Sequence, residues 1–85
     1  MADDEGFREQ IEALRVADLV AGAASTLASL AYAKLAAHDR DEAKRAIDAL
    51  ASLVPHLDGE PKRDLGTALA DLQVAWAEGR SGDSL

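Results

Sequence analysis

The sequence contains no cysteine, which excludes disulfide bonds and thiolate metal sites. Aromatic residues make up only 4% of the chain, namely Phe7, Tyr32 and Trp76. A hydrophobic core must therefore be built from Leu, Ile, Val and many Ala, and each Ala buries little area. A glycine-rich phosphate-binding loop is also absent from the sequence.

Positive charge is scarce as well. Nine Lys and Arg stand against 16 Asp and Glu, which gives a net charge of −7. Such a chain repels nucleic-acid phosphates and anionic membrane surfaces. The acidic start MADDEGF lacks the basic segment and apolar run of a secretory leader. We therefore expect a cytoplasmic protein that binds neither nucleic acid nor membrane.

A chain of 85 residues allows one domain at most, and a core of that size is only marginally stable alone. We expect a flexible acidic N-terminus over residues 1–6, a single helical domain over 7–79 and a flexible tail over 80–85. No internal repeat suggests a different division.

The stretch from Leu19 to Ala37 dominates the chain. It carries one charge, Lys34, and places apolar side chains on every face when wound as a helix. Such a helix favours burial on all sides, and two short partner helices cannot cover it. Its length would suit a bilayer span, but its Ala, Ser and Thr residues contribute little transfer energy. The mismatch therefore indicates self-association.

One line of this stretch follows the spacing of a heptad seam, with steps of four, three, four and four. A second line, Ala23, Leu30 and Ala37, lies beside it. We predict that the first line, together with the aromatic residue of the last helix, forms an oligomer interface. The predicted interface residues are Val20, Ala24, Leu27, Ala31, Leu35 and Trp76.

The apolar spacing predicts an all-α domain of three helices, over about 7–37, 41–55 and 61–78. The long first helix packs against the other two, and dimerisation completes a helical bundle. Whether this helix breaks near Val16 stays open, because neither Gly nor Pro stands there.

Several residues mark the ends of the second and third helices. Asp39 followed by Glu42 resembles a capping box. Pro55 ends the second helix, because proline disfavours helical geometry in the residue before it. Pro61 suits the first position of the third helix, and Gly79 suits its end.

Candidate chemistry is sparse. The two histidines lie beside turn carboxylates, His38 near Asp39, Asp41 and Glu42, and His56 near Asp58 and Glu60. Neither group has a recognised metal-ligand spacing, so solvated turn residues are the favoured interpretation. The hydroxyls of Ser25, Thr26 and Ser29 have no base nearby in sequence. We expect no catalytic, cofactor or metal site, and no enzyme.

The helix pattern resembles the domain of unknown function 1844 family of small bacterial proteins. The segments that carry the resemblance are VADLVAGAASTLASLAYAKL, DRDEAKRAIDALASLV and LGTALADLQVAWAE. The signature residues are Ala43, Ile47, Asp48 and Leu50, followed by Leu69, Leu72 and Trp76. The resemblance covers roughly residues 16 to 78 and implies a helical fold in a bacterial cytoplasm, without a reaction. The segment VPHLDGEPKR departs from the Lys-Gly-Asn-Leu-like segment of many members.

The function that we expect is a non-catalytic interaction protein that forms a homo-oligomer, with a dimer as first choice. One alternative is an adaptor whose apolar groove binds a helix of another protein, such as one linked to translation or stress. A second alternative is a small-ligand or metal binder that uses the turn histidines and carboxylates.

Overall fold

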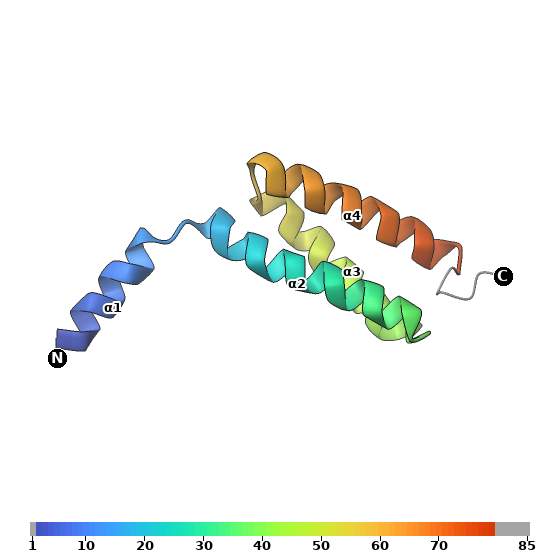
Figure 1. Cartoon of the computed structure of the whole chain (residues 1–85), viewed down its shortest axis with the longest axis horizontal. Helices are drawn as coiled ribbons and strands as arrows, with labels where there is room; N and C mark the ends of the chain where they lie inside the picture. The colour runs from blue at the N-terminus through green and yellow to red at the C-terminus, as the bar shows by residue number, and fades with distance from the viewer. Residues whose placement is uncertain (1, 80–85) are drawn as a thin grey trace.

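The computed structural model describes residues 2–79, and helices account for 88% of that part of the chain. No strand occurs there, so the predicted all-α class is confirmed. The predicted tail over 80–85 lies outside the described residues. A short 3-10 turn, η1 (Val54–His56), joins the third and fourth helices. The four α-helices are α1 (Ala2–Ala13), α2 (Val16–Ala36), α3 (Arg40–Leu53) and α4 (Gly59–Ala77) (Figure 1).

Helices α2, α3 and α4 pack side by side as a three-helix bundle (Figure 1). Alanines without accessible surface, such as Ala24, Ala31 and Ala43, let the helix backbones approach closely. Leu50 of α3 and Leu72 of α4 are the largest fully buried side chains. The buried cluster consists of Ala24, Ala28, Ala31, Leu35, Ala43, Ala46, Ile47, Leu50, Leu57 and Leu72.

The structure divides the predicted first helix in two. α1 ends at Ala13 and α2 begins at Val16, whereas the apolar spacing predicted one helix over 7–37. Arg15 adopts an extended backbone with φ −93° and ψ 138°, which interrupts the helix. Its guanidinium Nη2 lies 2.8 Å from the Asp58 carboxylate, so the break is attached to the loop before α4. α1 also begins at Ala2, five residues before the predicted start at residue 7.

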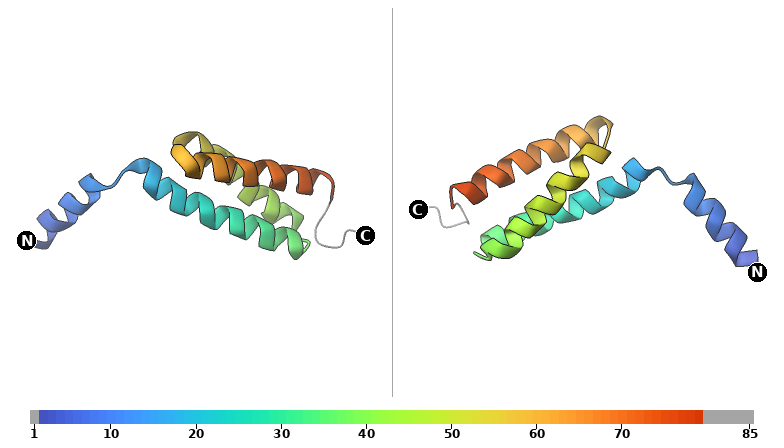
Figure 2. Two further views of the ribbon diagram at one scale, coloured as in Figure 1. Left: turned by 45° about the horizontal axis from the view of Figure 1, so that its top comes forward. Right: turned by 180° about the vertical axis from the view of Figure 1, so that it is seen from behind.

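α1 stands apart from the bundle. It contacts no other helix within residues 2–79, and it stays clear of α3 and α4 in all three views (Figures 1 and 2). The radius of gyration is 16.1 Å. A compact domain of this length would have about 12 Å. The extended shape follows from a helix that has no packing partner among the other described helices.

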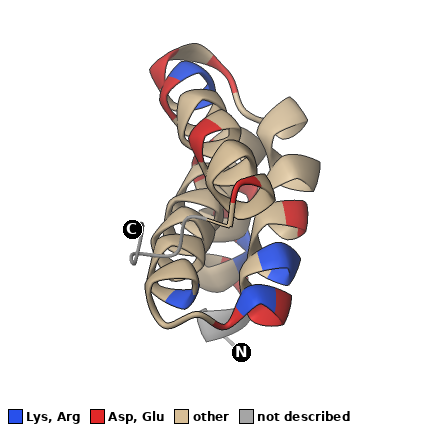
Figure 3. Ribbon diagram, turned by 90° about the vertical axis from the view of Figure 1, so that its right-hand side faces the viewer, with Lys and Arg blue, Asp and Glu red and all other residues tan. Residues whose placement is uncertain are grey.

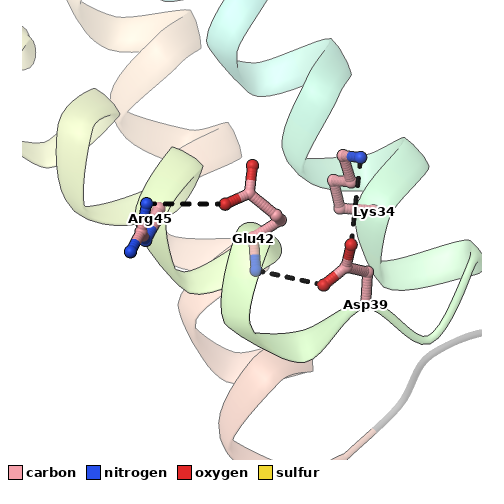
Figure 4. Close-up of polar contacts among 4 residues, drawn as sticks. All are labelled: Lys34, Asp39, Glu42 and Arg45. Carbon is pink, nitrogen blue, oxygen red and sulfur yellow. Dashed lines mark hydrogen bonds and ion pairs between the residues drawn. The ribbon is translucent and has the colours of Figure 1, made fainter.

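The N-terminus of α3 carries the predicted aspartate cap. The Asp39 Oδ1 atom accepts a hydrogen bond from the Glu42 backbone N–H at 3.3 Å (Figure 4). A capping box needs a second hydrogen bond, from the Asp39 backbone N–H to the Glu42 side chain. That bond is not formed, because the Glu42 carboxylate lies 3.8 Å from Arg45 instead. The Asp39 backbone N–H instead donates to the Lys34 carbonyl at 2.9 Å. One of the two expected capping bonds is therefore present.

Replacing Asp39 with alanine is expected to lower the free energy of unfolding by about 1 kcal/mol, the usual cost of a lost aspartate cap. Chemical denaturation followed by circular dichroism measures the change. Asp39→Asn is the matched control, because it keeps the oxygen that accepts the Glu42 N–H and removes the charge beside Lys34, 3.9 Å away. Equal losses in the two variants would assign the effect to the ion pair and contradict the cap.

The remaining helix ends follow the proline and glycine signals. α3 ends at Leu53, and Pro55 stands in η1. α4 begins at Gly59, two residues before the predicted start, so Pro61 lies in its first turn, where a backbone N–H has no partner within the helix. Gly79 follows the end of α4 with a positive φ of 71°, a conformation that suits glycine.

Candidate interaction surface

The predicted oligomer interface lies inside the chain's own bundle. Ala24 and Ala31 have no accessible surface and Leu35 is buried, while Val20 and Leu27 are half-buried against the same core. A residue without accessible surface is not available to a second copy in this arrangement. The heptad-like line therefore packs within one chain in this structure. Helix packing within a chain and between copies uses the same residue spacing, so the sequence alone does not distinguish the two.

Trp76, the last residue of the predicted oligomer interface, connects the end of α4 to the start of α3 through hydrogen bonds and a cation–π contact. Its indole Nε1 donates a hydrogen bond to the Arg40 carbonyl at 3.0 Å, and the Arg40 Nη2 donates to the Trp76 carbonyl at 3.0 Å. The Arg40 guanidinium carbon lies 4.2 Å from the ring centroid, within cation–π range. These contacts give Trp76 a packing role within one chain.

Arg40→Ala is expected to lower the free energy of unfolding by about 1 kcal/mol, because it removes a cation–π contact and a hydrogen bond together. Lys44→Ala is the control, since Lys44 Nζ lies 5.6 Å from the ring centroid. We expect its effect to be about half as large. Denaturation followed by the fluorescence of Trp76, the only tryptophan in the sequence, measures both variants. An effect of Lys44→Ala that equals or exceeds that of Arg40→Ala would contradict this role.

A line of apolar residues on α2 is left uncovered. Val16 and Leu19 are 70% and 66% exposed, and Leu30 is 42% exposed. With the exposed Ala23 they are spaced three, four and seven residues apart, which places them on one side of the helix. We call Val16, Leu19, Ala23 and Leu30 the outer stripe. Ala23 and Leu30 belong to the second line that the sequence indicated.

α1 presents an apolar line of its own. Phe7, Ile11 and Leu14 are spaced four and three residues apart, and each is about half exposed or more, with Phe7 at 65%. Phe7 and Ile11 lie on α1, and Leu14 follows directly after its end. We call these three residues the arm stripe. None of them is covered by the bundle, because α1 packs against no other described helix.

The surface left uncovered is large for the size of the chain. The accessible surface is 5822 Å². A compact monomer of this mass exposes about 4,800 Å². The difference, about 1,000 Å², is similar to the area that one partner buries in a standard protein interface, about 800 Å². The extended shape therefore leaves uncovered about as much surface, polar and apolar together, as one partner contributes to a standard interface.

Charged groups interrupt the α2 part of this surface little. α2 carries only Asp18 and Lys34 along its 21 residues. Figure 3 shows charged residues separated by wide uncharged stretches of ribbon.

The four described ion pairs are at least partly exposed, so each contributes little to stability. The described part of the chain has no buried side-chain nitrogen or oxygen that lacks a hydrogen-bond partner.

α2 is also the one described helix that is long and apolar enough to cross a bilayer, judged by length and composition. The central helix of a soluble bundle passes the same test. Only 17% of its most apolar window of 18 residues is buried, which again shows how much of this helix the chain leaves uncovered.

The histidines and carboxylates of the turns are not gathered into a site. His38, which has a positive φ of 63°, and His56 are both exposed. Within residues 2–79 no group of three or more His, Asp or Glu residues comes close enough to hold a metal ion. These side chains are distributed over separate turns instead.

A shallow hollow of about 290 Å³ lies between α3 and α4. Its charged lining residues, Lys44 and Asp48, already pair with each other at 3.0 Å. The hollow is lined by Lys44, Ile47, Asp48, Gln73 and Trp76. It therefore offers few free polar groups for a ligand.

The chain was compared with known proteins at three levels. No family model matches the sequence, and neither a curated protein nor a solved structure matches it.

Proposed function

We propose that this chain is a non-catalytic interaction protein that pairs with a second copy of itself through the outer stripe of α2. The observation that carries the proposal is the exposure of Val16, Leu19 and Leu30 on one side of a nearly uncharged helix. Soluble monomers rarely leave large contiguous apolar patches in water. Covering this stripe with an apolar face of a second copy removes both surfaces from water at once.

The size of the chain supports the same proposal. A domain of 85 residues buries a smaller fraction of its surface than a large domain does, so its own core supplies limited stability. The arrangement that we propose is a dimer in which each copy covers the outer stripe on α2 of the other. Self-association would add buried apolar area that the bundle lacks.

We also propose where in the cell the protein works. The net charge of −7 favours a soluble cytoplasmic protein that contacts neither nucleic acid nor membrane. The resemblance to the domain of unknown function 1844 family, and the bacterial origin that it implies, stay predictions.

Thermal unfolding at several protein concentrations tests the proposal. If folding and association are linked, the melting temperature rises with concentration. We expect a clear rise between micromolar and millimolar protein. A melting temperature that does not change over this range would overturn self-association and would leave the outer stripe free for a helix from another protein.

A further inference from the structure

We propose that α1 is an arm exchanged between two copies, so that the arm stripe of each copy lies on the outer stripe of the other. This inference rests on the self-association proposed above and adds the segment that makes the contact. Phe7, Ile11 and Leu14 of one chain would then cover part of the outer stripe of its partner.

α1 lacks support from the rest of the described chain. It has 12 residues, includes Gly6 and contacts no other described helix. Isolated helices shorter than about 12–15 residues are marginal in water. An amphipathic helix of this length gains stability when its apolar face packs against another surface. The arm stripe is the face that is available for such packing.

The two stripes also fit each other in shape. At 1.5 Å per residue, the arm stripe from Phe7 to Leu14 spans about 11 Å, so it covers about half of the outer stripe, which spans about 21 Å from Val16 to Leu30. Large side chains on the arm meet a stripe whose centre is small, because Ala23 is preceded by the exposed Gly22. A methyl group placed on Gly22 would meet nothing within 4 Å, so the space beside Ala23 is open. Large residues opposite small ones let two helices interlock.

The direction of α1 favours a contact with another copy. The arm leaves the bundle and projects away from α3 and α4 (Figures 1 and 2). Where α1 leaves the bundle, Arg15 has an extended backbone and forms a 2.8 Å ion pair with Asp58. This ion pair lies beside the start of α4. A projecting arm reaches a second copy more readily than the outer stripe of its own α2. The excess surface of about 1,000 Å² per chain is sufficient for the resulting contact.

Cysteine cross-linking between two differently tagged chains tests the exchange, because the natural sequence contains no cysteine. One full-length chain carries Ile11→Cys on the arm. The other carries Leu19→Cys, Ala23→Cys or Leu30→Cys on the outer stripe. After mixing and mild oxidation, we expect a disulfide between the two tags for at least one stripe position, since disulfides form only when Cα atoms are within about 7 Å.

The matched controls keep each helix and change its face. Glu9→Cys replaces Ile11→Cys on the arm, and Ser25→Cys replaces the stripe positions on α2. Both controls are at exposed positions and should give little mixed disulfide. Cross-linking that is as strong at Ser25 as on the stripe would overturn the exchange. A chain with both Ile11→Cys and Ala23→Cys that closes only within itself would also overturn it, because the arm would then fold back.

A second measurement separates failure of the exchange from failure of self-association. Phe7→Ala combined with Ile11→Ala should raise the dissociation constant of the dimer roughly 100-fold, which corresponds to about 2.7 kcal/mol. Glu9→Ala should leave it nearly unchanged. A dimer that loses no affinity on the double change would overturn the arm exchange and leave self-association intact. A wild-type chain that is a monomer at every concentration would overturn both.

Discussion

Replacing Leu72 with alanine is expected to remove most of the folding stability of the chain. Leu72 lies in α4 with no accessible surface, in a core that is built mainly from alanine and leucine. A buried Leu→Ala change costs about 2–5 kcal/mol, because apolar contacts are lost and a cavity stays behind. Small domains have little more than this in total. Urea denaturation followed by circular dichroism should show a folded fraction that falls sharply even at low denaturant.

Val74→Ala is the matched control for Leu72→Ala. Val74 lies on the same helix two residues later and is 47% exposed, so its shortening creates no enclosed cavity. We expect a loss below about 1 kcal/mol for this variant. If the two variants lose similar stability, Leu72 is not in the core and the packing of α4 on α2 and α3 is contradicted.

The second large effect is expected from Leu19→Glu combined with Leu30→Glu. Both leucines belong to the outer stripe, are 66% and 42% exposed in the single chain and lie outside the core cluster, so glutamate there does not disturb the core. In the proposed dimer the same positions are buried, and two carboxylates would have to be removed from water. The dissociation constant should rise by at least about 100-fold, with the helix content unchanged. Sedimentation velocity and circular dichroism on the same samples measure the two quantities.

Ser25→Glu combined with Ser29→Glu provides the control for this prediction. These serines are also exposed on α2, and the change adds the same charge to the same helix. The control should keep the affinity of the wild-type chain to within a few fold. Dissociation by both double variants would point to charge repulsion between chains and contradict a contact that is specific to the outer stripe.

The sequence predicted the helical class and most helix ends, because caps, prolines and glycines act locally. Asp39, Pro55 and Gly79 mark their ends in the structure much as expected. The break at Arg15 was left open, because neither Gly nor Pro marks it; the structure shows an extended backbone there and an ion pair with Asp58, 43 residues away. A contact so distant in the chain leaves no local pattern.

Which face of α2 packs inside the chain was harder to predict for a related reason. α2 is apolar on nearly every face, so its spacing alone cannot tell which face packs inside the chain. The line through Ala24 and Ala31 is the one that faces α3 and α4. The line through Ala23 and Leu30, which is weaker in the sequence, is the one left exposed. Packing against α3 and α4 decides which of the two lines is buried.

Light scattering coupled to size-exclusion chromatography, over a wide range of loading concentrations, tests self-association most directly. The chain has a mass of 8.9 kDa. We expect a particle of twice that mass at the higher concentrations, with a fall toward one chain on dilution. A well-folded particle of one chain at every concentration would contradict self-association.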